Sequence, residues 1–257
     1  MFTPADAPVA LVGYPTEVGR ALRELGIPAL DVPTEHPKEV AQACQTLRFA
    51  GALVAPGQQG QWLGAAQADP EARRVGRIDA VAFHGAAGAS GTFAYADALS
   101  DMIEASGYSA RGASLAVLGN TAADLALAAP LARLGFSDIG LVADSAPEAE
   151  KAIRDLPTGL RIFPMSRRDA SVKALVSRSD LVVLATGDLP TGLLEPYHTL
   201  LDLTGRVSRS AVSGTLLDLA ELQLFHLARQ LLHATGQRFA PEQLRPLAAA
   251  ARGTAAK

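Results

Sequence analysis

Residues 114–144 read SLAVLGNTAADLALAAPLARLGFSDIGLVAD, and this stretch carries the clearest structural signal in the chain. Its two ends, 114–118 and 138–143, are short apolar runs, which are typical of buried β-strands. The residues between them, 122–134, have the length and the apolar spacing of a helix. Two strands joined by a helix form a βαβ unit, in which the right-handed crossover makes the strands parallel. The stretch therefore predicts a parallel sheet with helices packed on it.

Short apolar runs alternate with helical patterns along the rest of the chain as well. The sequence predicts further strands at 9–13, 28–32, 51–55, 80–83, 160–163, 181–185 and 200–203. It predicts further helices at 16–24, 38–47, 59–67, 70–74, 93–106, 147–156, 169–177, 213–234 and 241–251. The glycine-rich segment 84–91 is expected to be a loop. This order predicts the α/β class, with two α/β units built on parallel sheets.

The composition indicates a folded globular protein. The chain has 257 residues, of which 49% are hydrophobic and 19% are charged, and this argues against intrinsic disorder. A net charge of −3 gives no electrostatic reason to bind nucleic acid or an anionic membrane, so we expect neither as a partner. The single cysteine, Cys44, excludes an internal disulfide, and the five histidines lack metal-ligand spacing, so no metal is expected.

Targeting and membrane-spanning segments are not expected. The first residues, MFTPADAP, lack the basic and apolar regions of a secretory signal. The most apolar stretch, 115–134, is interrupted by Asn120, Asp124, Pro130 and Arg133, and is too polar to span a bilayer. The sequence therefore predicts a cytoplasmic protein.

Five short motifs follow one another along the chain in a recognisable order. They are Gly13-Tyr-Pro15, Gly51-Ala-Leu-Val-Ala-Pro56, Gly76-Arg-Ile-Asp-Ala80, Val117-Leu-Gly119 and Asp180-Leu-Val-Val-Leu-Ala-Thr186. In that order they look like the G-x-P, G-x-N-V-T-x-P, G-A-V-N-T, glycine-rich turn and A-D-L-V-V-N-A-T segments of the shikimate dehydrogenase family. The resemblance covers nearly the whole chain. The sequence thus resembles a distant member of the shikimate/quinate 5-dehydrogenases.

The resemblance implies a domain plan and an activity. It implies a catechol-like substrate domain at 1–108, a Rossmann-like doubly wound NAD(P)-binding-type domain at 109–211, and C-terminal helices at 212–257 that pack back on the first domain. It also implies interconversion of 3-dehydroshikimate and shikimate with NAD or NADP as cofactor, and a homodimer is one expected assembly. Because folds host many functions, each chemical position is considered separately.

The position of the catalytic lysine differs from the family pattern. The family places a lysine after V-T-x-P to move the hydroxyl proton, and this chain has Gln58 or Gln59 there, depending on a one-residue gap. An amide does not accept a proton at neutral pH. The chain has four lysines beside 19 arginines, and no lysine lies between positions 39 and 150, so no shift of the alignment supplies one. The sequence therefore predicts that the proton-transfer lysine is missing.

The aspartate that partners this lysine in the family is missing as well. Tyr95 falls at the place of the aspartate in the family's N-T-D, and Asp79 replaces the asparagine of G-A-V-N-T. Tyr95 is a candidate hydrogen-bond donor or, with Asp79 or His84 nearby, a weak acid–base group. The alternative is that Tyr95 only packs in the core or at its rim.

The cofactor turn keeps one glycine of the family motif. A dinucleotide site needs glycines so that backbone amides approach the pyrophosphate at a helix N-terminus. The chain has Gly119-Asn-Thr-Ala-Ala-Asp124, which loses the next two glycines. Thr121 and Asp124 also match a capping box, in which side chains bind the same amides. The turn is therefore expected to bind a phosphate poorly.

Three further residues are candidates for contacts with a cofactor. Asp144 lies 25 residues beyond Gly119, the spacing of the acid that binds an adenosine ribose, and this favours NAD over NADP. The alternative for Asp144 is an ordinary loop residue. Asn120 and Thr186 are candidates to line a smaller nucleotide or anion site.

Three functions remain open from the sequence. The first is a shikimate-dehydrogenase-like protein without ordinary shikimate dehydrogenase activity, possessing the oxidoreductase scaffold alone. The second is an active NAD-linked dehydrogenase acting on shikimate, quinate or a related small polyol acid. The third is a non-catalytic module that binds a small molecule or another protein. The missing lysine and aspartate and the capped turn favour a protein without the ordinary activity.

Overall fold

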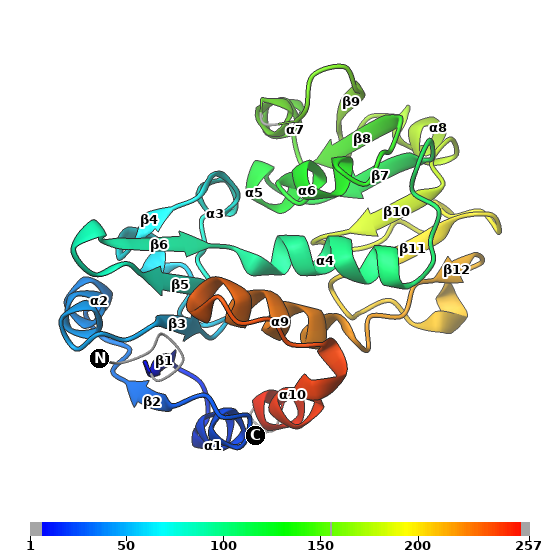
Figure 1. Ribbon diagram of the computed structural model, residues 1–257. Helices are drawn as coiled ribbons and strands as arrows, with labels where there is room; N and C mark the ends of the chain where they lie inside the picture. The colour runs from blue at the N-terminus through cyan, green and yellow to red at the C-terminus, as the bar shows by residue number, and fades with distance from the viewer. Residues whose placement is uncertain (1–6, 155, 253–257) are drawn as a thin grey trace. The chain divides into compact units, whose positions relative to one another are not determined.

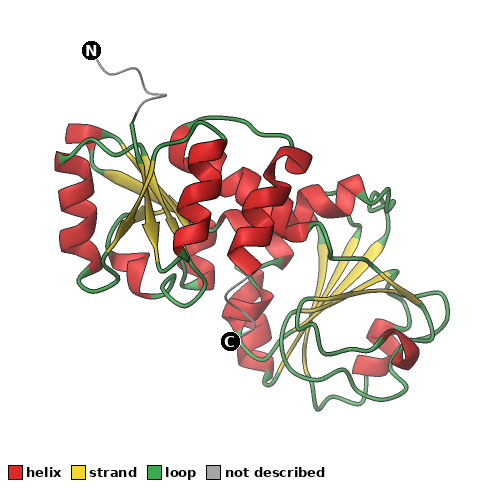
Figure 2. Ribbon diagram, turned by 90° about the horizontal axis from the view of Figure 1, so that it is seen from below, coloured by secondary structure: helices red, strands yellow, loops and turns green. Residues whose placement is uncertain are grey.

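The chain folds into two compact α/β units in this computed structural model, which describes residues 7–154 and 156–252 (Figure 1). The first unit contains the residues up to Leu99 and those from Glu221 onward, and the second unit is Ser100–Ala220. The division falls within helix α4 (Ala94–Ala105). Figure 2 shows both sheets with helices packed beside them. The predicted α/β class is confirmed.

The sheet of the first unit has six strands in the order β2-β1-β3-β5-β6-β4. The strands are β1 (Val9–Val12), β2 (Ala29–Val32), β3 (Gly51–Val54), β4 (Gln67–Ala68), β5 (Ala80–Phe83) and β6 (Ala89–Thr92). Strand β1 is parallel to both of its neighbours, whereas β5 is antiparallel to β3 and to β6. The prediction of a fully parallel sheet is therefore wrong for this unit.

The antiparallel pair results from a hairpin that the sequence analysis read as a loop. Only residues 84–88 separate β5 from β6, and a connection this short joins antiparallel strands. Gly85 and Gly88 have φ angles of +57° and +97°, which a residue with a side chain rarely adopts. Strand β6 consists of Ala, Ser, Gly and Thr, so it lacks the large apolar residues that identify a strand in sequence.

Helices of the first unit lie between its strands and after them. They are α1 (Thr16–Glu24), α2 (Pro37–Thr46), α3 (Pro70–Val75), α9 (Leu222–Thr235) and α10 (Arg245–Arg252), with 3-10 turns η2 (Gln61–Gly64), η3 (Gly85–Ala87) and η5 (Pro241–Leu244). Two predicted helices are shorter than expected. The segment 59–67 forms only η2, because its end turns into strand β4, and the long helix expected from 213 begins at Leu222.

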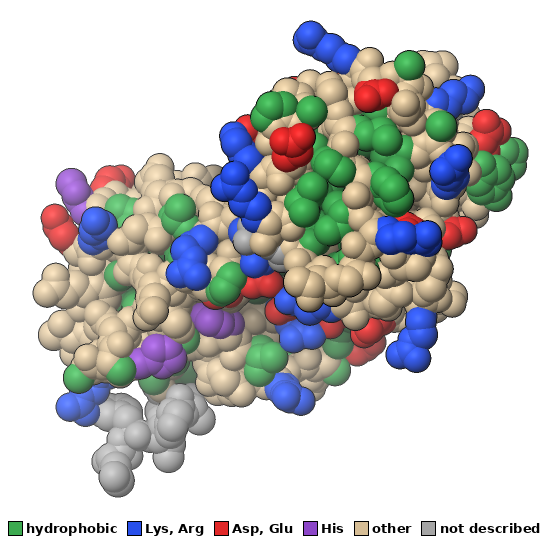
Figure 3. Space-filling model, turned by 90° about the horizontal axis from the view of Figure 1, so that it is seen from above, with side chains coloured by type: hydrophobic (Ala, Val, Ile, Leu, Met, Phe, Trp, Pro, Cys, Tyr) green, Lys and Arg blue, Asp and Glu red, His purple; other side chains and the backbone are tan. Residues whose placement is uncertain are grey.

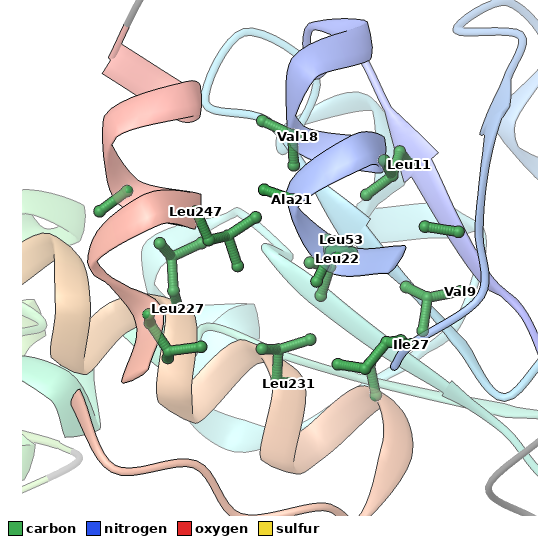
Figure 4. Close-up of a cluster of buried hydrophobic side chains, with 14 of the residues drawn as sticks. Val9, Leu11, Val18, Ala21, Leu22, Ile27, Leu53, Leu227, Leu231 and Leu247 are labelled. Atoms are coloured by element: carbon green, nitrogen blue, oxygen red, sulfur yellow. The ribbon is translucent and has the colours of Figure 1, made fainter. Parts of the chain in front are cut away.

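The C-terminal helices complete the core of the first unit. Leu227 and Leu231 of α9 and Leu247 of α10 are buried with Val18 and Leu22 of α1 (Figure 4). Helix α9 also lies directly on β3, since an added Cβ at Gly51 would be 2.5 Å from the carbonyl oxygen of Ala234. Any side chain at position 51 would push the helix away from the sheet. The chain thus closes its first core with its last helices.

The second unit is a doubly wound parallel sheet in the order β12-β11-β10-β7-β8-β9. Its strands are β7 (Ser114–Leu118), β8 (Asp138–Ala143), β9 (Arg161–Ser166), β10 (Leu181–Leu184), β11 (Thr199–Asp202) and β12 (Thr215–Leu216). Every pair of neighbours is parallel, as predicted. This is the Rossmann order, in which chain connections reverse direction between β7 and β10. Ligands of such sheets bind at this switch point, outside the carboxyl ends of the strands.

The helices of the second unit are short. They are α5 (Ala122–Leu125), α6 (Ala128–Ala132), α7 (Ala146–Ile153) and α8 (Val172–Val176), with the 3-10 turn η4 (Arg209–Ala211). The single helix predicted at 122–134 is therefore two helices. Pro130 explains the break, because it has no N–H to donate to the carbonyl of Ala126 and its ring crowds that carbonyl.

We predict that Leu231→Ala lowers the free energy of unfolding by about 2–5 kcal/mol, because this side chain is fully buried and its truncation leaves a cavity. Urea unfolding followed by circular dichroism measures the change. The matched control is Leu47→Ala, since Leu47 is 68% exposed and its truncation should cost less than about 0.5 kcal/mol. Equal losses for the two variants would contradict the role given to the C-terminal helices.

Candidate functional site

Asp79 is the centre of a buried polar cluster in the first unit. Its side chain is 0% exposed, and it precedes β5 at the edge where β3 and β6 end. Its carboxylate accepts hydrogen bonds from the backbone N–H groups of Ala94 (2.7 Å) and Tyr95 (2.9 Å). These two amides open helix α4, whose N-terminus favours a negative charge. The structure therefore brings Asp79 and Tyr95 together. The hydrogen bond joins the Asp79 side chain to the backbone of Tyr95 and does not involve the Tyr95 hydroxyl.

Helix α9 supplies two residues of this cluster that the sequence analysis did not select. His226 Nε2 lies 2.7 Å from Asp79 Oδ2, and Gln230 Nε2 donates to the backbone carbonyl of Asp79 at 2.7 Å. The Tyr14 hydroxyl donates to Gln230 Oε1 at 3.3 Å. His226 and Gln230 are four residues apart, so they lie on one face of the helix. Two polar residues at this spacing on a mainly apolar helix are the signal that identifies them.

The Tyr95 hydroxyl is a weaker acid than an ordinary tyrosine in this environment. Burial raises its pKa to about 12, so the hydroxyl stays protonated at neutral pH. Its ring packs edge-on against the His226 ring, with the centroids 5.3 Å apart. Burial also raises the pKa of Tyr14 above its ordinary value. His84, the other candidate partner, is bonded to Ser90 Oγ at 2.8 Å. Tyr95 therefore keeps its hydroxyl proton at neutral pH and is not a base.

The two glutamines at the predicted lysine position pack against, or form hydrogen bonds with, neighbouring parts of the first unit. Gln59 is 5% exposed; its side chain donates to the carbonyl of Val54, and its own carbonyl accepts from the amide of Ile78. Gln58 packs over Gly13, where an added Cβ would come within 2.9 Å of Gln58 Cγ. Gly13 also has a φ of +69°, so a glycine is needed there for two reasons.

The predicted cofactor turn of the second unit is closed by side chains of the chain itself. The amide of Asn120 donates to Asp124 Oδ2 (3.1 Å) and to Thr186 Oγ1 (3.0 Å). The amide of Thr121 donates to Asp124 Oδ2 at 2.9 Å, and the predicted capping box of Thr121 and Asp124 is present. The amide of Ala122 donates to Glu148 Oε2 at 2.9 Å. All three backbone N–H groups that follow Gly119 are thus engaged.

Two of the three groups that bind these amides, Asp124 and Glu148, are carboxylates, and the third is the Thr186 hydroxyl. Hydrogen bonds from Lys151 and from the amide of Ala122 hold the pKa of Glu148 below its ordinary value, so Glu148 is a carboxylate at neutral pH. Asp124 lies on helix α5, which begins at the turn, and presents a second carboxylate to the turn. A pyrophosphate at this place would have to displace two carboxylates and would meet their charge. The residues of the turn therefore do not fit a pyrophosphate.

Arg167, which follows β9, fills the space between the carboxyl ends of β7 and β10. Its guanidinium donates to the carbonyls of Gly119 (3.0 Å), Asp188 (2.9 Å) and Thr186 (3.4 Å). Its Nε lies 3.6 Å from Asp144 Oδ1, so the residue with ribose-binding spacing is paired with an arginine. Arg167 was not predictable from the sequence, because nothing local marks an arginine whose partners follow two other strands.

A third set of contacts shapes the loop after β11. Asp202 is 5% exposed, and its carboxylate accepts from the amide and hydroxyl of Thr204 (2.9 and 2.6 Å) and from the amide of Val207 (2.8 Å). Burial alone would raise the pKa of Asp202, but these hydrogen bonds outweigh burial and lower it. The charged carboxylate therefore fixes the conformation of residues 203–207.

Comparisons with solved structures identify the fold. The chain is similar to shikimate 5-dehydrogenase from Listeria monocytogenes, in complex with shikimate and NAD, at 15% identity and a TM-score of 0.75, covering 93% of this chain and 95% of that one. It is similar to quinate dehydrogenase from Corynebacterium glutamicum, in complex with NAD, at 14% identity and a TM-score of 0.74, covering 94% and 98%. It is also similar to ligand-free 5-ketofructose reductase of Gluconobacter sp. strain CHM43, at 15% identity and a TM-score of 0.71, covering 96% and 98%.

These similarities confirm the two-domain fold that the sequence resemblance implied. No protein-family model matches the chain. No curated protein sequence matches it either. At 14–15% identity, these similarities show the fold and not the activity.

The described residues contain neither a cluster of metal-ligand side chains nor a helix suited to a membrane. Within 7–154 and 156–252, no group of three or more His, Cys, Asp or Glu side chains could hold a metal ion. None of the helices in these ranges is long and apolar enough to cross a membrane. Figure 3 shows one face of the molecule, where Lys and Arg side chains are scattered among acidic and uncharged ones.

We predict that Asp79→Ala lowers the free energy of unfolding by about 3 kcal/mol or more, because it leaves two amides and His226 without their acceptor. Chemical denaturation measures the loss, and hydrogen exchange should show faster exchange in the first turn of α4. Asp31→Ala, at an exposed position of β2, is the control and should change stability little. Unchanged exchange at Ala94 and Tyr95 would contradict the capping role.

We predict that the contribution of Asp202 to stability depends on pH. Its pKa is lowered in the folded protein, so its stabilisation is present above the ordinary carboxyl pKa of about 3.9 and is lost as the pH falls through the folded value. Asp202→Asn should therefore be less stable than the parent at pH 7, with a difference that shrinks below about pH 4. Thermal unfolding across this pH range tests the expectation.

The matched control for this pH series is Asp188→Asn, because the Asp188 side chain is 92% exposed. It should show little difference from the parent at any pH. A difference between Asp202→Asn and the parent that is constant from pH 7 to pH 3 would contradict the account of Asp202.

Proposed function

We propose that this protein is a small-molecule-binding protein on a shikimate-dehydrogenase-like scaffold, without ordinary shikimate dehydrogenase activity. The observation that carries the proposal is the engagement of the three turn amides by Asp124, Glu148 and Thr186. The fold family implies NAD or NADP at this turn, and the amides are what would hold its pyrophosphate. A cofactor would have to break these bonds and place its phosphates beside two carboxylates.

The proton-transfer position supports the same proposal. Hydride transfer to or from an alcohol needs a group that moves the hydroxyl proton. Gln58 and Gln59 have no acid–base function at neutral pH, and the pKa of Tyr95 is about 12. Asp79 is occupied with the amides of α4 and with His226. None of these residues reproduces a lysine–aspartate pair.

The competing function is an active NAD-linked dehydrogenase of shikimate, quinate or a related small polyol acid. Three observations favour it. The similar dehydrogenases from Listeria and Corynebacterium are in complex with NAD, and Asp144 has the spacing of a ribose-binding acid. The 2.7 Å contact of His226 with Asp79 is also an arrangement that an acid–base pair uses. Against it, Arg167 binds Asp144 and fills the switch point.

We predict that NAD⁺ and NADP⁺ at 1 mM leave the melting temperature of the protein unchanged, and that no shikimate or quinate oxidation is detectable. A ligand at a hundred times its Kd adds about 2.7 kcal/mol to the free energy of unfolding, which is a shift of several degrees for a chain of this size. Differential scanning fluorimetry and absorbance at 340 nm are the measurements.

An active shikimate dehydrogenase, assayed under the same conditions, is the positive control for both readouts. A shift of several degrees with either dinucleotide would contradict the interpretation of the turn. A turnover above about 1 s⁻¹ with shikimate or quinate would establish the competing function.

A further inference from the structure

A cavity of about 540 Å³ opens in the second unit beside the switch point that Arg167 fills. It lies at the carboxyl ends of β10 and β11, between the loops 187–192 and 204–208. Its volume is in the range of small-molecule sites, and the carboxyl ends of parallel strands are where such sites lie in doubly wound sheets. The cavity is separate from the occupied turn amides.

The floor of the cavity is apolar. Leu184, the last residue of β10, is fully buried beneath it, and Leu189, Leu194 and Val207 line its walls. These wall residues are partly buried and pack against the core cluster of the second unit. The apolar surface they leave open is therefore continuous with the core, and it suits a compact hydrocarbon group.

The rim carries one positive and one negative charge. Arg206 Nη2 donates to the carbonyl of Gly187 at 3.2 Å, and Arg206 Nη1 lies 3.5 Å from Asp188 Oδ1. The two side chains are 63% and 92% exposed, so their mutual attraction is screened by water and weak. The guanidinium has five N–H donors, and these contacts leave donors for a ligand carboxylate.

Both sides of the cavity are held in place. On the β10 side, Arg167 and Arg206 bind successive carbonyls of the loop, those of Asp188 and Gly187. On the β11 side, Asp202 fixes residues 203–207, and the amide of Arg206 donates to Thr204 Oγ1 at 3.2 Å. A site formed in advance in this way loses little entropy when a ligand binds.

We infer that this cavity binds a small zwitterion with an apolar side chain, an α-amino acid of the leucine or phenylalanine type, with its carboxylate on Arg206 and its ammonium group on Asp188. A ligand with only a carboxylate would lie beside Asp188 and be repelled, whereas a zwitterion matches both charges. The apolar walls formed by Leu189, Leu194 and Val207 take the side chain. This inference rests on the proposed function, since it names the small molecule that the scaffold binds.

The test is isothermal titration calorimetry of the full chain with L-leucine and L-phenylalanine. Two analogues of leucine separate its charges: 4-methylpentanoate lacks the ammonium group, and 3-methylbutylamine lacks the carboxylate. We expect saturable binding of at least one of the amino acids and at least about tenfold weaker binding of both analogues, because each analogue loses one charged contact. No binding of either amino acid at 10 mM, or equal binding of the analogues, would overturn the inference.

Two variants connect the binding to the rim. Arg206→Gln and Asp188→Asn should each weaken binding of the amino acid by about tenfold or more. Asp188→Asn should also strengthen binding of 4-methylpentanoate relative to the parent. Arg178→Gln, an exposed arginine of the same unit outside this cavity, is the matched control and should bind as the parent does. Unchanged affinity in both rim variants would place any bound amino acid elsewhere and overturn the inference.

Titration of NAD⁺ and NADP⁺ in the same experiment separates the two proposals. If neither the amino acids nor the dinucleotides bind, the zwitterion site is overturned and the proposed loss of cofactor binding still holds. Dinucleotide binding that competes with the amino acid overturns both, because the cavity would then be part of a cofactor site. Unchanged circular dichroism spectra of the variants exclude unfolding as the cause of weaker binding.

Discussion

The hydrogen bonds from the amides at the start of α5 to Asp124 and Glu148 use up the backbone donors at the switch point of the second unit. A backbone N–H that already donates to a carboxylate has no second proton for a phosphate. The doubly wound sheet places these amides at the switch point, where a dinucleotide would lie. In this chain, the amides that the fold places at the switch point thus form hydrogen bonds with side chains of the protein itself.

The first unit contains a second buried set of hydrogen bonds, centred on Asp79. Asp79 stands where the resemblance to shikimate dehydrogenases places a polar site residue, and it is fully buried. Its two oxygens hold the start of α4 and contact His226, while its carbonyl accepts from Gln230. Removing one member would leave buried donors unpaired, which is costly in a low-dielectric interior. The cluster therefore ties α9 to the sheet together with the buried leucines of the same helix.

Residues whose role is local were predictable from the sequence, and residues whose role needs a distant partner were not. Strands β5, β7 and β8 have the predicted bounds, because each is an apolar run with clear ends. The capping box of Thr121 and Asp124 was also predictable from its spacing. Strand β6 was missed because its small residues carry no apolar signal. Arg167 and His226 were missed because their partners come from other strands and helices.

The most direct test of the central claim is the response of three backbone amides in solution. In a ¹H–¹⁵N NMR titration with NAD⁺, the signals of Asn120, Thr121 and Ala122 report whether phosphate oxygens replace Asp124, Glu148 and Thr186 as their acceptors. We expect these three signals to stay in place at millimolar NAD⁺. Large, saturable shifts of these three signals, with the rest of the spectrum little changed, would contradict this expectation and return the turn to a cofactor-binding role.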